Sequence, residues 1–271
     1  MSEQRERIIR PAADAPVPLF SGPSGWLQGL GLAGMALAGC AGLYLRILLG
    51  RARLDLPAFA AALRQAGLSM LPAITLVSVA VGLILGHQTQ AILDQFDLPG
   101  LILLSFTYTI VTELVPLLVG ILIAGRAGVA LAVRQATLAV SGELDGLLVS
   151  GIDPIEFTLG PLLLAMLLMS FAFVVWSTLI TFCASALWLW AREDLPPALF
   201  LDALTQALTP ADLLAVVLKP LLFAVLIALV ATVNGTAAGR DPDGIALAAT
   251  RTMIGAVVAI LVADLLYILL A

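Results

Sequence analysis

Long apolar stretches, separated by short polar segments, dominate the chain. Five of them are long enough to cross a bilayer as helices, since about 20 mainly apolar residues span a hydrocarbon core roughly 30 Å thick. They run from Leu68 to Gly86, Pro99 to Gly125, Leu159 to Ala191, Ala211 to Val233 and Thr252 to Ala271. These unbroken runs lack the alternating pattern of barrel strands. The sequence therefore predicts an all-α integral membrane protein with five transmembrane helices.

A sixth apolar stretch, Trp26 to Leu45, contains no charge but five glycines, so hydropathy alone does not decide whether it crosses. Lys and Arg collect on the cytoplasmic side near the ends of spans. If this stretch lies along the cytoplasmic interface, eleven arginines share that side and only Arg192 lies outside. We expect an N-terminal interfacial helix, a cytoplasmic N-terminus and a C-terminus outside. A sixth span is the alternative.

This arrangement divides the chain into an N-terminal cytoplasmic segment with the interfacial helix, residues 1–66, and a five-span membrane domain, residues 67–271. Hydrophobic residues make up 61% of the chain and charged residues 11%, against about 25% charged in soluble domains. The composition excludes a soluble catalytic domain. The net charge of −5 also argues against nucleic acid as a partner, because that binding depends on clustered Lys and Arg.

Catalytic and metal-binding motifs are missing from the sequence. A P-loop ends in Gly-Lys-Ser/Thr, whereas the single lysine, Lys219, is followed by Pro220. Metal sites and Ser-His-Asp triads would both depend on the one histidine, His87, which we expect to be structural. We therefore expect no catalytic residue, metal or cofactor in this chain.

Three charged residues lie within predicted spans: Glu113, Lys219 and Asp264. A charge inside a span costs about 2.5 to 3.5 kcal/mol and normally faces a protein interior or a wet cavity. Such residues either line a transport path or tie helices together. Lys219 and Asp264 both lie roughly 10 to 12 Å below the outer surface. We therefore predict that they pair, with Lys219 also able to contact a lipid phosphate.

The segment between the second and third spans, Ala124 to Phe157, is too polar to cross the membrane. Its apolar residues recur at spacings typical of an amphipathic helix, which predicts a helix on the cytoplasmic face. Asp153 and Pro154 should end this helix, because the residue before proline avoids the helical region. The segment is either an ordinary interfacial helix or a docking surface for a cytoplasmic partner.

Three fragments of the sequence resemble one protein family. TELVPLLVGILIAGRAGVALA, from Thr112 to Ala132, resembles the E-L-G-P…A-G-R-x-G signature of the MlaE-type permeases. ELDGLLVSGIDPIEF, from Glu143 to Phe157, resembles the family's Q-I-D-A-L…M-G-V-D-P segment. ATRTMIGAVVAILVADLLYILL resembles its C-terminal T-T-R span. The similarity runs from about Leu68 to the C-terminus.

The resemblance implies a permease subunit of an ABC transporter that moves phospholipid or a related lipid between the bacterial inner membrane and periplasmic MCE-domain proteins. It implies a homodimer with the lipid between its copies, a cytoplasmic ATPase dimer that binds ATP and Mg, and a small STAS-domain regulator. The segment after Arg126 would be the coupling helix. The candidate coupling residues are Arg126, Gly128, Glu143, Asp145, Gly151, Asp153 and Pro154.

This chain departs from the family pattern at three positions. Val115 replaces a usual glycine, and Arg134 and Gly142 each replace a usual glutamate on the presumed coupling surface. Two other functions stay open. One is an ion-coupled secondary transporter in which Glu113 or Asp264 binds a proton, although such proteins often show internal repeats and none is visible here. The other is a membrane scaffold that only anchors periplasmic partners.

Overall fold

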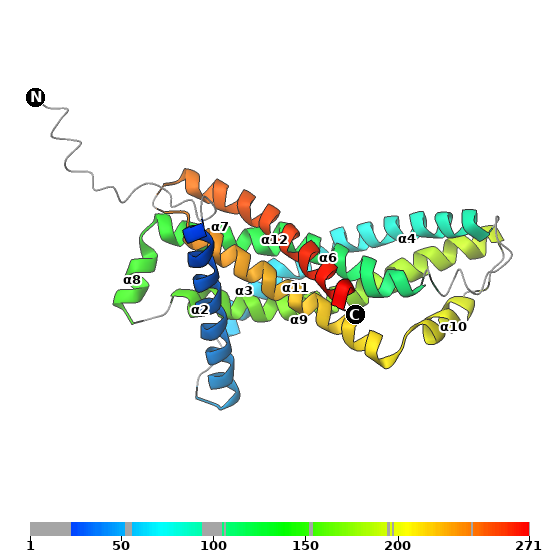
Figure 1. Ribbon diagram of the computed structural model, residues 1–271, viewed down its shortest axis with the longest axis horizontal. Helices are drawn as coiled ribbons and strands as arrows, with labels where there is room; N and C mark the ends of the chain where they lie inside the picture. Colours follow the sequence, from blue (N-terminus) through cyan, green and yellow to red (C-terminus); the bar gives the residue numbers. More distant parts are fainter. Residues whose placement is uncertain are drawn as a thin grey trace, which may run out of the picture. The chain divides into compact units, whose positions relative to one another are not determined.

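The computed structural model describes residues 23–51, 56–93, 105, 107–151, 154–193, 196, 198–239 and 241–270. Every regular element in these ranges is a helix, as Figure 1 shows. The predicted all-α membrane fold is confirmed. The described residues belong to two compact units, each built from three separate parts of the chain, so the two are described in turn.

The first unit combines the described parts of Met1–Phe59, Ala124–Leu163 and Leu226–Val258. Its helices are α2 (Pro23–Leu48), the π-helical turn η3 (Ala124–Gly128), α7 (Val129–Val140) and α8 (Glu143–Val149), with the beginning of α9 (Pro154–Glu193), the end of α11 (Pro210–Thr236) and most of α12 (Asp243–Leu270). Gln135 on α7 is buried and donates to the Thr158 hydroxyl on α9 at 3.2 Å. Ala136, Ala238 and Ala248 form a small apolar core beside this contact.

The second unit combines the described parts of Ala60–Ile123, Leu164–Val225 and Ala259–Ala271. It contains most of α3 (Leu56–Ala66), the 3₁₀ turn η1 (Leu68–Met70), α4 (Leu71–Leu93), the π-helical turn η2 (Ile110–Leu114), α6 (Val115–Ile123) and α10 (Ala198–Ala207), together with the remainders of α9, α11 and α12. The sequence did not predict α3 or α10.

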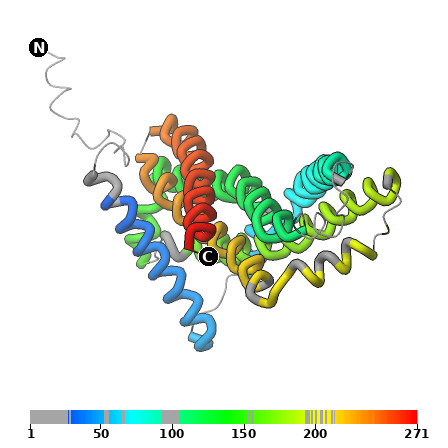
Figure 2. The backbone as a smooth tube through the Cα atoms, turned by 45° about the vertical axis from the view of Figure 1, so that its right-hand side comes forward, coloured from blue at the N-terminus to red at the C-terminus, as the bar shows by residue number. Residues whose placement is uncertain are grey.

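Within the second unit, α4 and α9 run side by side along small and hydroxyl residues, and Figures 1 and 2 show both helices. A side chain at Gly82 would place its Cβ 2.6 Å from the Thr181 carbonyl oxygen, so only glycine allows this approach. Ser185 Oγ donates to the Gly82 carbonyl at 2.8 Å, and the hydroxyls of Ser78 and Ser177 lie 2.7 Å apart. Small residues and hydroxyl pairs are what bring membrane helices together.

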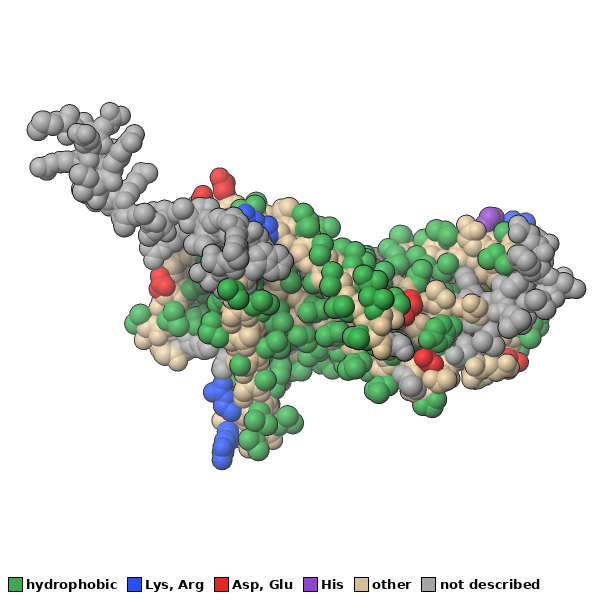
Figure 3. Space-filling model, in the orientation of Figure 1, with side chains coloured by type: hydrophobic (Ala, Val, Ile, Leu, Met, Phe, Trp, Pro, Cys, Tyr) green, Lys and Arg blue, Asp and Glu red, His purple; other side chains and the backbone are tan. Residues whose placement is uncertain are grey.

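Six described helical segments are long and apolar enough to cross a membrane: Gly29–Leu48, Leu56–Ile92, Thr107–Val140, Phe157–Arg192, Leu214–Thr236 and Asp243–Leu270. Hydrophobic side chains dominate their visible surface in Figure 3, as a lipid environment requires. The first segment lies in α2, where the sequence predicted a helix. Whether α2 crosses the membrane or lies at its interface stays a prediction, as does the proposed division at residues 66 and 67.

Several predicted boundaries are wrong. The second span does not end near Gly125, because the helix continues through η3 into α7 without a break. Apolar residues such as Leu131 and Ala132 are fully buried there and hold the extension in the bundle. The third and fifth spans also begin earlier than predicted, in helices that start at Pro154 and Asp243. A proline at the first helical position explains the earlier start of α9.

Candidate functional site

Glu113 lies in the π-helical turn η2, where the chain passes from the preceding helical residues into α6. A π-turn adds one residue to a helical turn and often marks a functional position. Two residues beyond this turn, Pro116 has no backbone N–H, so it cannot donate to the carbonyl of Thr112 four residues before it. This carbonyl is therefore available to another donor.

Lys219, on α11, is that donor, and its ammonium group joins parts of three helical segments. Its Nζ donates to the Thr112 carbonyl oxygen at 3.2 Å and to Glu113 Oε2 at 2.6 Å. It also lies 3.1 Å from Asp264 Oδ1, and 4.4 Å from the ring centroid of Tyr267 on α12. We call Glu113, Lys219, Asp264 and Tyr267, with the Thr112 carbonyl, the Lys219 cluster.

The pairing of Lys219 with Asp264 that was predicted from their matching depths is confirmed. Glu113 forms the shorter contact with Lys219, and the sequence analysis missed it. Counted from the predicted start of the second span at Pro99, Glu113 would lie about 21 Å below the surface, roughly twice as deep as Lys219. The described helix containing Glu113 takes up a π-turn and runs on to Val140, so depth counted from Pro99 is not a reliable guide.

The Lys219 ammonium is directed entirely at protein atoms. A lysine has three N–H donors, and here three oxygens lie within 3.2 Å of Nζ. Its side chain is only 3% exposed, whereas those of Glu113 and Asp264 are 31% and 14% exposed. A contact between Lys219 and a lipid phosphate would therefore require one of these interactions to break. The accessible part of the cluster consists of its carboxylates.

A second polar contact in the same unit secures the start of α11. Thr209 and Asp212 bond reciprocally: the Thr209 N–H and hydroxyl donate to Asp212 Oδ2 at 2.9 and 2.6 Å, and the Asp212 N–H lies 3.3 Å from the Thr209 hydroxyl oxygen. With Pro210 at the first helical position, this is a capping box. The hydroxyl and N–H donors of Thr209 hold the pKa of Asp212, which precedes the span Leu214–Thr236, below its usual value.

The predicted coupling segment consists of two helices and not one. Gly142, between α7 and α8, has a φ of 77°, a left-handed conformation that interrupts the helix. α8 ends at Val149, and Gly151 follows with a φ of 73°. Pro154 is buried and begins α9 instead of simply ending the segment.

The other coupling candidates lie at different depths in the first unit. Gly128 is buried at the start of α7, and Arg126 is exposed in η3. Glu143 and Asp145 are exposed in the first turn of α8, where negative charge favours a helix. No residue of α8 is buried. Asp153 lies outside the described residues.

A pocket with a volume of about 290 Å³ lies beside α8 in the first unit. It is lined by Leu144, Asp145 and Leu148 from α8, Gln135 from α7, Pro154 and Thr158 from α9, and Thr236 from α11. The sequence analysis did not anticipate this pocket, because its lining residues come from four helices.

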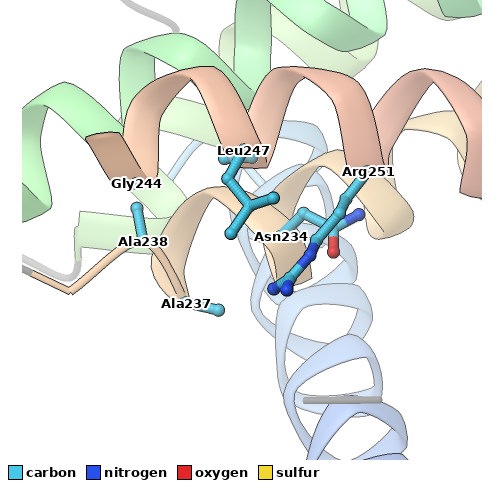
Figure 4. A pocket seen from close by; sticks show the side chains of 7 residues that line it. Asn234, Ala237, Ala238, Gly244, Leu247 and Arg251 are labelled. Atoms are coloured by element: carbon cyan, nitrogen blue, oxygen red, sulfur yellow. The ribbon is translucent and has the colours of Figure 1, made fainter. Parts of the chain in front are cut away.

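A smaller pocket in the same unit separates the end of α11 from the start of α12. Figure 4 shows Arg251 extending from α12 past the carboxamide of Asn234, which is 4% exposed. The volume of about 10 Å³ admits roughly one water-sized atom. This pocket is too small for a lipid headgroup. Among the described residues, no group of three His, Cys, Asp or Glu side chains could hold a metal ion.

Comparison with known proteins places these features in a family. The Permease MlaE family matches residues 59–270. The chain belongs to the MlaE permease family. Both π-turns fall in the fragments that carried the resemblance, η2 with Glu113 and η3 with Arg126.

The relatives that match are mostly ABC transporter permeases. A probable ABC transporter permease of Rickettsia prowazekii is 24% identical over 74% of this chain and 77% of its own length. A probable ABC transporter permease of Synechocystis is 27% identical over 61% of each chain. The chloroplastic protein Trigalactosyldiacylglycerol 1 of Arabidopsis thaliana is 27% identical over 61% of this chain and 46% of its own length.

These findings make the protein a multi-pass membrane permease of the ABC transporter class. A permease subunit of this class is not itself the catalyst and works with an ATPase partner. The roles of Glu113, Lys219 and Asp264 in transport, and of the α7–α8 segment in coupling, stay predictions.

Proposed function

We propose that this MlaE-family permease moves phospholipid or a related lipid between the bacterial inner membrane and periplasmic MCE-domain proteins. A separate cytoplasmic ATPase dimer binds ATP and Mg and drives the movement. The permease acts as a homodimer with the lipid path between its copies, and a small STAS-domain protein regulates the complex. Glu113, Lys219 and Asp264 border the outward part of the lipid path.

The family match over residues 59–270 carries this proposal. The Arabidopsis relative, whose name is that of a glycolipid, supports a lipid as the transported class. The Lys219 cluster adds a physical argument, because a buried charge in a membrane span is costly and normally faces a cavity or a protein interior. Membership of an ABC permease family favours ATP-driven transport over the ion-coupled and scaffold alternatives.

Lipid transfer in a reconstituted complex tests the substrate. Proteoliposomes that contain the permease, the ATPase encoded beside it and the neighbouring MCE protein should transfer fluorescent phospholipid in an ATP-dependent manner. Transfer that continues without ATP but depends on a proton gradient would favour the ion-coupled alternative. Transfer that is absent although the complex assembles would favour the scaffold.

Coupling to the ATPase is tested on α8. Asp145→Arg should abolish lipid-dependent ATP hydrolysis while the permease stays folded and dimeric, since Asp145 is exposed in the first turn of this helix. Gly151→Trp should also abolish hydrolysis, although its φ of 73° strains any side chain, so Asp145→Arg is the cleaner variant. An unchanged hydrolysis rate with Asp145→Arg would remove α8 from the coupling surface.

The proposed orientation places the N-terminus in the cytoplasm and the C-terminus in the periplasm, based on the arginine distribution. A reporter fused after Ala271 should read as periplasmic, and one inserted at Gly50 as cytoplasmic. If the reporter after Ala271 reads as cytoplasmic, the arrangement of five spans with an interfacial helix is wrong.

A further inference from the structure

The pocket beside α8 combines apolar walls with polar atoms from a different helix. Leu144, Leu148 and Pro154 supply apolar surface, and Gln135 and Thr158 supply polar groups. Both polar side chains are 1% exposed, so they lie at the buried side of the lining, whereas Leu148 is 62% exposed. A ligand entering past α8 would meet apolar surface first and polar groups last.

Gln135 has an unused hydrogen-bonding capacity. Its Nε2 donates to Thr158 Oγ1 at 3.2 Å, and the Thr158 hydroxyl donates to the Pro154 carbonyl oxygen at 2.7 Å. The donors of both groups are thus occupied, while Gln135 Oε1 has no partner among the described residues and is buried. A buried amide oxygen without a donor is unfavourable. The polar end of this pocket therefore suits a ligand that brings an N–H.

Charge also favours a donor. Asp145 contributes a carboxylate to the lining, and Glu143 lies on the same short helix. α8 itself contains no Lys or Arg. Long basic side chains bury an apolar stem and place their charged donors at its end. This combination matches apolar walls that lead to a carboxylate and an unpaired amide oxygen.

We propose that this pocket receives a long basic side chain, Arg or Lys, from the cytoplasmic ATPase. The inference rests on the proposed function, because it assumes that the ATPase docks on α8. It adds that one inserted side chain, and not only the exposed surface of α8, fixes the ATPase on the permease.

Filling the pocket tests this directly. Leu148→Trp should raise the dissociation constant between the permease in nanodiscs and its ATPase by about tenfold or more, as loss of a central contact does. Val149→Trp is the matched control, because Val149 is 90% exposed on the same helix and does not line the pocket. Its dissociation constant should change by less than about twofold. Equal weakening by both variants would overturn the proposal and assign binding to the surface of α8.

A double-mutant cycle identifies the occupant. Gln135→Met removes the amide oxygen, and each basic residue on the ATPase docking face is changed to Met in turn. One of these residues should lose at least about threefold of its effect on binding in the Gln135→Met background. If no basic residue couples to Gln135, while an apolar residue of the ATPase does, the occupant is apolar and the proposal is wrong.

Two outcomes separate this inference from the proposed function. Binding that responds to Asp145→Arg but not to Leu148→Trp leaves α8 as the docking surface and overturns only the inserted side chain. Failure of the wild-type permease to bind the ATPase at all overturns both. Thermal unfolding of each variant should match the wild type, since Leu148 and Val149 are both exposed.

Discussion

The Lys219 cluster and α8 both contain charged residues, but they use charge in opposite ways. In the cluster, Lys219 is 3% exposed and contacts Glu113 and Asp264, which lie far away in the sequence. On α8, Glu143 and Asp145 are exposed, and no residue of the helix is buried. The cluster neutralises charge inside the protein, whereas α8 presents charge outward. The first arrangement suits a membrane interior, and the second suits a partner.

The largest expected effect tests whether the cluster is internally compensated. Lys219→Met leaves Glu113 and Asp264 facing each other without a cation, which should cost about 3 to 5 kcal/mol of unfolding free energy in detergent. Adding Glu113→Gln and Asp264→Asn should restore most of this stability. Restored stability without lipid transfer would assign the charges to transport, and restoration of both would assign them to structure. An unchanged stability of Lys219→Met alone would contradict the observed pairing.

The same chemical change in the two regions sharpens the comparison. Glu113→Gln weakens a charge-assisted hydrogen bond of 2.6 Å and should destabilise the protein by about 1.5 to 3 kcal/mol. Glu143→Gln alters an exposed carboxylate and should change stability by less than about 0.5 kcal/mol. Denaturant titration of both variants measures the difference. Similar values for the two would remove the distinction between inward and outward charge.

Glycines provide a comparison without charge. Gly82→Ala would bring a methyl group to 2.6 Å from the Thr181 carbonyl oxygen, so we expect a loss of about 1 to 3 kcal/mol. Gly146→Ala on α8 meets no atom within 4 Å and should be neutral or stabilising by up to about 1 kcal/mol, because alanine favours helices. Thermal unfolding in one detergent should rank Gly82→Ala lowest. A tolerated Gly82→Ala would mean that α4 and α9 can separate at little cost.

The smallest effect concerns Asp212, whose pKa is lowered by the Thr209 hydroxyl and N–H. A lowered pKa in the folded state means that the stabilisation is present above the ordinary Asp value of about 3.9 and is lost as the pH falls through the folded value. Asp212→Asn should therefore lower the melting temperature slightly between pH 5 and 8. The difference from the wild type should disappear in acid. A difference that grows in acid would contradict the capping role.

The sequence predicted those features that depend on hydropathy and depth. Long apolar runs indicated the membrane helices, and the matching depths of Lys219 and Asp264 indicated their contact, because an unpaired charge in a span is unfavourable. Glu113 was recognised as an intramembrane charge but not as a partner of Lys219. No residue pattern announces a π-turn, and a helix boundary set by hydropathy alone is too coarse to align three helices.

The α7–α8 segment shows a different kind of error. Its apolar spacing predicted one helix, although Ser141 and Gly142 already suggested a break, since glycine readily adopts the left-handed conformation seen at Gly142. The burial of Gln135 could not be predicted, because it depends on contacts with α9. The pocket beside α8 likewise requires the packing of four helices, which a single sequence does not contain.

The wide sequence separation of the Lys219 cluster has a consequence for how the protein is made. Lys219 follows Glu113 by 106 residues, and ribosomes add roughly 5 to 20 residues per second. Glu113 is therefore synthesised about 5 to 20 seconds before its cation exists, and Asp264 comes later still. The early helices must be held, by the insertion machinery or by each other, until α11 arrives. An arrest of translation between these two residues would release a chain whose intramembrane glutamate has no partner, a direct signal for membrane quality control.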